Sequence, residues 1–169
     1  MAQAHKLTGV EPCRSYRENA RTILPQKVEE VWTWEPFIRD AARREELHNM
    51  RISIKRLRYT MEIFHVAYTV PKGCFEETAG IHGKRFAEFL AVIVDLQEIL
   101  GDVHDADVVL GVLTDDTQRM VESVLAPGVA TLIARTKATR KADYETFLRK
   151  WEHLSATDFK QKLLSFLAG

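Results

Sequence analysis

The sequence predicts an all-α protein, an antiparallel helical bundle of about four long helices plus shorter ones. Apolar residues recur at three- and four-residue steps over long stretches, which is the spacing of one helix face. Eight glycines and five prolines among 169 residues are too few for a protein of many tight hairpins. Valine-rich pieces such as residues 91–94 and 107–110 resemble buried strands, but their flanks keep helical spacing, so helix is favoured.

The N-terminal part is predicted to contain two consecutive helices. The first covers residues 15–24 and ends at Pro25, because proline lacks the N–H that a helix interior requires. Proline also suits the first turn of a helix, so the second helix is expected over roughly residues 25–42. Pro36 lies inside that second helix and should kink or break it.

The middle of the chain carries the clearest helical signal, over residues 45–66. Its apolar residues share one helix face, and they are Leu47, Met50, Ile54, Leu57, Met61 and Phe64. A long helix is then predicted over residues 75–100, and Gly101 is a natural stop after it. Asp102 can cap a further helix that runs through Leu113.

The C-terminal part is predicted to contain two breaks and two more helices. Residues 114–117 are interpreted as a break before a short helix, and Pro127-Gly128 as a second interruption. A final long helix is expected over residues 129–153, followed by a small amphipathic helix over residues 158–166. The cations of the long helix, Arg140 among them, are spread around its axis and are interpreted as surface residues.

Composition and charge indicate one helical domain over residues 15–169, after a flexible leader of residues 1–14. The 24 Lys and Arg residues balance the 24 Asp and Glu residues, so any anion-binding surface must come from local clustering of cations. Cys13 and Cys74 have neither metal-ligand spacing nor a disulfide framework, which favours reduced thiols and a cytoplasmic location. Neither a signal peptide nor an apolar run of about 18 residues is recognisable, so we expect no membrane partner.

A row of cations lies in residues 47–59. Because an α-helix turns by about 100° per residue, Arg51, Lys55 and Arg58 fall within roughly 80° on one side of His48. No acidic residue lies between the first and the last of these cations, so like charges repel one another within one helix. Two interpretations stay open: a solvated charged face, or a site at which a polyanion neutralises the cations.

Other basic and aromatic residues extend this pattern or depart from it. Arg44 and Tyr59 fall on the same stripe of the helix as His48. Arg56 points away from the stripe and needs a separate explanation. Lys84 and Arg85 begin the apolar part of a later helix, where they either extend the basic surface or are simply solvated.

The second candidate segment contains His104-Asp105 and Asp107. Histidine and carboxylates bind several divalent metals, which gives one interpretation, but adjacent residues on a helix point in different directions. Capping of a helix by Asp102 and Asp105 is another interpretation. The favoured hypothesis is that Asp105 or Asp107 orients an arginine or lysine of the cationic row.

Three motifs carry a resemblance to a known family. They are His48-x-x-Arg51-x-x-x-Lys55-Arg56-Leu57-Arg58-Tyr59, then Leu96-Gln97-x-x-Leu100-Gly101-x-x-x-Asp105, and finally Tyr144-x-x-Phe147-x-x-x-Trp151. Over roughly residues 28–154 the chain resembles the CHAD family, the conserved-histidine α-helical domains. Members of that family commonly carry two such basic motifs in a chain about twice as long. The resemblance is therefore to a single half of the usual unit.

The resemblance implies both a fold and a function. The family's usual fold is a pair of helical bundles related by pseudo-twofold symmetry, whose basic helices line a central surface that binds inorganic polyphosphate. Carried over to this sequence, it implies that a set of basic residues faces the phosphate chain, namely His48, Arg51, Lys55, Arg56 and Arg58. Asp105 would steady one of these side chains, and Tyr59 would donate a hydrogen bond. The expected function is non-catalytic binding of polyphosphate or a similar linear polyanion, with no cofactor and no metal.

Two other functions and one assembly state are also considered. A metal-dependent phosphohydrolase would use His48, His104, Asp105 and Asp107 as its ligands. A helical adaptor would bind an acidic protein with its basic face, and nucleic acid is a less expected partner because the whole chain carries no net positive charge. A homodimer is expected, because one chain supplies one basic helix to a site lined by two. Candidate dimer contacts are Trp32, Trp34, Phe37, Phe159 and Phe166.

Overall fold

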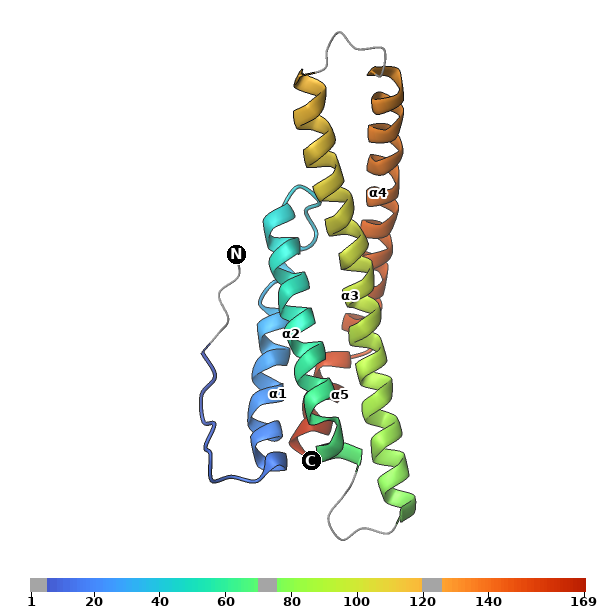
Figure 1. The fold of residues 1–169 in the computed structure, drawn as a ribbon. Coiled ribbons are helices and arrows are strands. Elements are labelled where there is room, and N and C mark those ends of the chain that lie inside the picture. The colour runs from blue at the N-terminus through green and yellow to red at the C-terminus, as the bar shows by residue number, and fades with distance from the viewer. Residues whose placement is uncertain (1–5, 70–75, 120–125) are drawn as a thin grey trace.

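The computed structural model describes residues 6–69, 76–119 and 126–169, and these form an all-α bundle (Figure 1). The elements are α1 (Tyr16–Trp32), η1 (Glu35–Phe37), α2 (Arg44–Thr69), α3 (Glu76–Arg119), α4 (Ala126–Ala156) and α5 (Phe159–Ala168), of which η1 is a short 3-10 helix. The long helices run antiparallel to their neighbours in the chain, and no strand occurs in the described ranges. The predicted fold class is therefore confirmed.

Helix α1 begins at a capping box formed by two side chains. The Ser15 hydroxyl accepts a hydrogen bond from the Glu18 N–H at 3.3 Å, and the Glu18 carboxylate accepts one from the Ser15 N–H at 2.9 Å. The Ser15 hydroxyl also donates to this carboxylate at 2.6 Å, and the hydrogen bonds from the Ser15 hydroxyl and N–H together lower the pKa of Glu18. Residues ahead of the helix also contact it, because the Thr8 N–H donates to the Gln26 side chain at 3.0 Å.

The break predicted at Pro25 is wrong, because α1 continues through this proline to Trp32. Leu24 and Val28, on either side of the proline, are completely buried, and their burial offsets the backbone hydrogen bond that proline cannot donate. The second predicted helix is helical over residues 25–32, where it is part of α1, and its remainder is a short irregular connection. Pro36 lies in η1 after α1 has ended, in agreement with the break expected there.

Helix α3 is a single helix of 44 residues. The stop predicted at Gly101 and the break predicted at residues 114–117 are therefore both wrong. Leu100 and Val103, on either side of Gly101, are each 1% exposed, so the buried stripe passes the glycine without interruption. Tertiary packing of this stripe outweighs the low helix propensity of one glycine, which costs about 1 kcal/mol.

The predicted interruption at Pro127-Gly128 is also wrong, because both residues belong to the first turn of α4. The first N–H groups of a helix have no partner within it, so a proline costs little there. The short helix predicted just before this point lies largely outside the described residues. The small helix expected over residues 158–166 is confirmed as α5.

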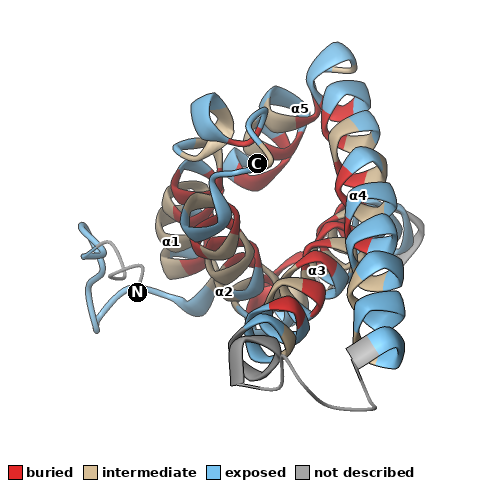
Figure 2. Ribbon diagram, turned by 90° about the horizontal axis from the view of Figure 1, so that it is seen from above, coloured by how far each residue is buried: buried red, intermediate tan, exposed pale blue. Residues whose placement is uncertain are grey.

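The core lies between the helices, and the buried parts of the long helices and of α5 are those that face the other helices (Figure 2). All six apolar residues predicted for the inner face of α2 are buried. Helix α5 closes the bundle against the first two helices, since Lys160 pairs with Glu29 at 2.7 Å and the Tyr68 hydroxyl donates to the Leu167 carbonyl at 3.2 Å. Burial raises the pKa of Tyr68 to about 12.

Most of the aromatic side chains considered for a dimer contact are used inside this bundle. The Trp32 ring packs on Trp151, with ring centroids 5.0 Å apart, and Trp34 Nε1 donates to the Ser53 hydroxyl at 3.1 Å. Phe159 and Phe166 belong to the buried core. Of the five candidates, Phe37 is the one that is exposed, so the proposed aromatic contact surface is corrected. No helix in the described ranges is long and apolar enough to cross a bilayer.

Candidate functional site on the seam between α2 and α3

The cationic row, defined as Arg44, His48, Arg51, Lys55 and Arg58, runs along the seam between α2 and α3. The seam is made by the two segments that stood out in the sequence. The imidazoles of His48 and His104 contact each other across it, with ring centroids 4.4 Å apart. Further along, the Arg51 guanidinium lies beside Gly101, where a Cβ atom would be 4.0 Å from Arg51 Nε. The first and second sequence motifs therefore belong to one site.

The two histidines share a hydrogen bond. His48 Nδ1 lies 3.1 Å from His104 Nδ1, so one ring donates its N–H while the other accepts with a bare nitrogen. This hydrogen bond can form when one of the two rings is protonated to imidazolium, but it cannot form when both rings are. Burial, the nearby His104 and the Arg51 charge together lower the pKa of His48, while Glu45 acts in the opposite direction. His48 is therefore held neutral at a pH at which a solvated histidine begins to take up a proton.

Arg51 and Lys55 carry the charges of the row that the chain leaves unneutralised. Neither pairs with a carboxylate of the described residues. Arg51 Nε is buried without a hydrogen-bond partner there, and so is the Oε1 atom of Gln97 on α3. The Lys55 ammonium lies over the ring of Tyr59, 5.8 Å from its centroid. These two positive charges and His48 form the open part of the site.

The other two cations of the row have internal partners. Arg58 pairs with Glu62 one turn further along α2, at 2.8 Å, and this hydrogen bond raises the pKa of Arg58. Arg44 pairs across the seam with Asp107 on α3, at 3.1 Å. The row is therefore continuous in position but uneven in pairing, because its two ends have carboxylate partners and its middle has none among the described residues.

Arg56 lies apart from the row, as its helical angle indicated. Its guanidinium donates to Glu30 on α1 at 3.1 Å, and the Lys27 ammonium binds the other oxygen of the same carboxylate at 2.7 Å. Burial alone would raise the pKa of Glu30, but the hydrogen bonds and charges of Lys27 and Arg56 outweigh it and lower this pKa. Arg56 thus belongs to a paired polar cluster between α1 and α2, in which it shares one carboxylate with Lys27.

Asp107 and Arg140 connect three helices near the start of the seam. Arg140 binds both oxygens of Asp107, at 2.8 and 3.0 Å, and donates to the Ala41 carbonyl at 3.0 Å. Arg140 is 9% exposed, so its assignment to the surface is wrong. The sequence could have indicated this burial, because Arg140 lies four residues before the buried Tyr144 and therefore on the same face of α4. Asp105 is exposed and forms no ion pair with the described residues.

The residues of the metal-site hypothesis do not come together as a ligand set. The described residues contain no group of three or more His, Cys, Asp and Glu side chains placed to hold an ion. His104 contacts His48, Asp105 is exposed on its own, and both oxygens of Asp107 bind guanidinium groups. Asp107, not Asp105, therefore orients a cation of the row, Arg44.

Arg85 does not join the row. Its guanidinium lies over the rings of Phe89 and Phe166, at 5.9 and 5.7 Å from their centroids, and thus faces α5 instead of α2. Lys84, the residue before it, is exposed on α3. The structure therefore separates Arg85 from the cationic row and brings it into a different environment.

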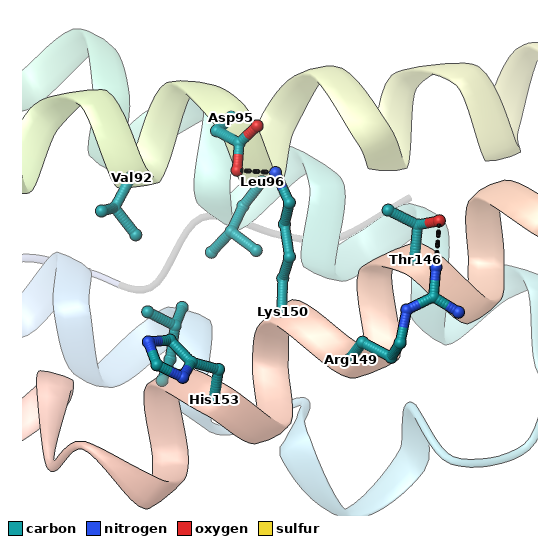
Figure 3. A pocket seen from close by; sticks show the side chains of 8 residues that line it. Val92, Asp95, Leu96, Thr146, Arg149, Lys150 and His153 are labelled. Atoms are coloured by element: carbon teal, nitrogen blue, oxygen red, sulfur yellow. Dashed lines mark hydrogen bonds and ion pairs between the residues drawn. The ribbon is translucent and has the colours of Figure 1, made fainter.

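A pocket of about 380 Å³ lies between α3 and α4, where Val92 and Leu96 form part of its apolar lining (Figure 3). Lys150 is neutralised across this pocket by an ion pair with Asp95. Arg149 donates to the Thr146 hydroxyl at 2.9 Å. Because Lys150 is already paired with Asp95, this pocket between α3 and α4 is a weaker anion site than the open part of the seam.

Comparison with known proteins identifies a domain family for the part of the chain that contains the seam. Residues 13–114 match the CHAD domain, a range that contains both α2 and the second motif on α3. The aromatic motif on α4, from Tyr144 to Trp151, lies outside the matched range. Searches of curated proteins and of solved structures found no match. Since the matched range covers more than half of the chain, this protein belongs to the CHAD domain family.

Proposed function

We propose that this protein binds inorganic polyphosphate, or a similar linear polyanion, along the cationic row without catalysing a reaction. CHAD domains are linked to polyphosphate binding, which supports the class of ligand. The observation that carries the proposal is the uneven pairing of the basic residues of α2. Arg44, Arg56 and Arg58 each have a carboxylate partner, whereas Arg51 and Lys55 have none in the described part of the chain.

The shape of the row favours a linear ligand. The row extends from Arg44 to Arg58, which is roughly 20 Å along the helix axis at about 1.5 Å per residue. A single small anion would contact one part of it, whereas a chain of phosphates contacts successive side chains. Hydrogen bonds between ionised partners contribute about 1.5–3 kcal/mol each, so a few simultaneous contacts are sufficient for tight binding.

The test is retention on immobilised polyphosphate as salt is raised. We compare an Arg51→Gln/Lys55→Gln double variant with a matched Arg135→Gln/Lys137→Gln variant, which removes the same charge from exposed positions on α4. The first should weaken binding at least tenfold and lower the slope of log affinity against log salt by about 1.5, by analogy with single-stranded nucleic acids. Equal losses in both variants would mean that net charge, not the row, determines binding.

Two further assays separate this function from its alternatives. Purified protein incubated with polyphosphate and Mg²⁺ or Mn²⁺ should release no orthophosphate. Sustained release that disappears in Asp105→Asn or Asp107→Asn would instead support a metal-dependent phosphohydrolase. An oligonucleotide or an acidic peptide should fail to displace polyphosphate at equal charge concentration, and displacement would support the adaptor hypothesis.

We also propose that two copies form a homodimer in which their cationic rows line a shared groove. Ile63 and Val66 follow Tyr59 on the outer face of α2, and they are 63% and 61% exposed. This apolar stretch adjoins the cationic row, so burying it between two copies would bring both rows to one side of the contact. Apolar contact there would offset the repulsion between two positive faces.

The dimer is tested separately from binding. Light scattering at several protein concentrations should show a dimer that polyphosphate stabilises by mass action. Ile63→Gln/Val66→Gln should yield monomers, whereas Val108→Gln/Val112→Gln, which changes an exposed apolar pair on α3, should not. A monomer under all conditions would exclude the dimer and leave the binding proposal to its own test.

A further inference from the structure

An open pocket of about 390 Å³ lies between the first part of α3 and helix α5. Residues of both helices and the residue after α5 line it, namely His82, Arg85, Gln161, Lys162, Ser165, Phe166 and Gly169. It lies toward the start of α3, whereas the histidine pair of the seam lies some twenty residues further along this helix, roughly 30 Å away at 1.5 Å per residue (Figure 1). We call it the α3–α5 pocket.

The α3–α5 pocket is lined by two cations, Arg85 and Lys162, that have no carboxylate partner within the described ranges. The side chains that line the pocket include no carboxylate among them. His82 adds a titratable group, and Ser165 and Gln161 add a hydroxyl and an amide. This is the reverse of the α3–α4 pocket, where Asp95 already neutralises Lys150.

Aromatic rings position the cations of this pocket. The Arg85 guanidinium lies over two rings at once, those of Phe89 and Phe166. The His82 ring also packs on Phe166, with centroids 5.7 Å apart. A guanidinium that stacks on rings keeps its edge N–H groups free to donate, so Arg85 is oriented before any ligand arrives.

We propose that the α3–α5 pocket binds a small phosphate monoester, with its phosphate at Arg85 and Lys162 and its organic group against the exposed His82 ring. A phosphate monoester carries up to two negative charges and three terminal acceptor oxygens, which matches two cations together with the donors of Ser165 and Gln161. Pockets of about 300–1,000 Å³ are typical of sites for small organic ligands. The His82 ring and the aliphatic stems of the long side chains supply apolar contact for the organic group.

The site differs in kind from the cationic row. The row is extended along a helix and suits a chain of charges, whereas this pocket brings its cations together around one point. Polyphosphate binding and binding of a phosphate monoester are therefore expected to respond to different substitutions. Because the proposal stands on residues of α3 and α5 alone, it does not depend on the function assigned to the seam.

Calorimetric titration with adenosine 5′-monophosphate tests the proposal, with inorganic phosphate and adenosine as comparison ligands. We expect saturable binding of the nucleotide, at least tenfold tighter than inorganic phosphate, and no binding of adenosine. Arg85→Gln and Lys162→Gln should each weaken nucleotide binding at least tenfold. Both side chains are exposed, so neither change should unfold the protein. The Arg51→Gln/Lys55→Gln variant of the row should keep nucleotide affinity within twofold.

Several outcomes would overturn the proposal. Absence of saturation at millimolar nucleotide would exclude the site, and equal affinity for inorganic phosphate would exclude recognition of an organic group. Equal affinity for adenosine would show that the phosphate is not recognised. If the row variant loses nucleotide binding while Arg85→Gln keeps it, the nucleotide binds the seam instead.

Discussion

Helix α2 presents basic residues to both of its neighbours, but the two sides differ in how their charge is balanced. Toward α1, Arg56 and Lys27 share the carboxylate of Glu30, which is 3% exposed. Toward α3, Arg51 and Lys55 have no such partner in the described chain. Burial makes an unpaired charge costly, so the buried Lys27 has a carboxylate partner, whereas Lys55 on the seam is exposed to solvent. Arg51 Nε on the seam is buried without a partner among the described residues. Whether a cation has a carboxylate partner, more than whether it is arginine or lysine, therefore distinguishes a structural cation from a candidate ligand contact.

The largest loss of stability is expected at Glu30, in the paired cluster between α1 and α2. Glu30→Gln removes the carboxylate charge that the buried Lys27 pairs with and shares with Arg56, so the free energy of unfolding should fall by about 3 kcal/mol. Urea denaturation measures this loss. Glu62→Gln, which removes the exposed partner of Arg58, is the matched control and should change stability little. Similar losses in both variants would remove the contrast between buried and exposed pairing.

The second largest loss of stability is expected at Asp107, which connects α3 to Arg44 on α2 and to Arg140 on α4. Asp107→Asn weakens the bidentate contact with the buried Arg140 and the pair with Arg44, so we expect a loss of about 2 kcal/mol in thermal or urea unfolding. Asp105→Asn, two residues earlier and exposed, should leave stability unchanged. A larger loss from Asp105→Asn than from Asp107→Asn would contradict the assignment of the supporting carboxylate.

A third prediction uses the pH dependence of binding to test whether His48, on the side of α2 toward α3, belongs to the site. The pKa of His48 is lowered in the free protein, and a bound polyanion should raise it, so binding takes up a proton. Affinity should then increase as pH falls through the range between these two pKa values, by up to about tenfold per unit. His48→Gln should flatten this dependence in polyphosphate titrations at several pH values. An unchanged profile would place His48 outside the site.

The same lowered pKa affects stability with a defined sign. Below the ordinary histidine pKa of 6.5 the unfolded chain takes up a proton at His48 before the folded chain does. Stability should therefore decrease as pH falls below about 6.5 toward the lowered pKa, and bound polyphosphate should reduce that decrease. Thermal unfolding of the parent and of His48→Gln across this range provides the measurement.

The smallest effect is expected at Gly101. A methyl group here would lie 4.0 Å from Arg51 Nε, which is an ordinary contact, so Gly101→Ala should stabilise α3 by about 0.5–1 kcal/mol. Gly111→Ala, where a methyl group meets no atom within 4 Å, is the control and should gain a similar amount. Gly83→Ala should gain less, because its methyl group would approach Thr69 Cγ2 at 3.2 Å. A loss of stability at Gly101 alone would indicate that Arg51 needs the space.

The elements that the sequence predicted well are those whose pattern is local. The inner face of α2 follows from the spacing of its apolar residues, and all of them are buried. The breaks expected at Pro25 and Gly101 were wrong because local propensity is overridden by burial of the neighbouring Leu24 and Leu100, which depends on distant helices. Rules based on local sequence do not indicate burial against distant helices, so helix boundaries were harder to predict than helix faces.

The same distinction applies to the site. The positions of Arg51 and Lys55 on one stripe followed from helical geometry. The same geometry set Arg56 apart, although the family resemblance implied that Arg56 faces the phosphate chain, and the structure pairs it with Glu30 on α1. Its partner Glu30 and the pairing of Arg140 with Asp107 were not predicted, because their members are 26 and 33 residues apart in the chain. The contact of His48 with His104 was not foreseen either, since His104 was considered only as a metal ligand.

The docking of α5 has a consequence for the order of folding. Successive long helices pack on one another, so most contacts form between segments close in the chain, and bundles of this kind fold in microseconds to milliseconds. Helix α5 is an exception, because it reaches back to α1, where Lys160 meets Glu29. We expect α5 to join last and to detach first in local opening, so its amide hydrogens should exchange earliest among the helices. Because α5 contributes one wall of the α3–α5 pocket, that pocket exists only after this final step.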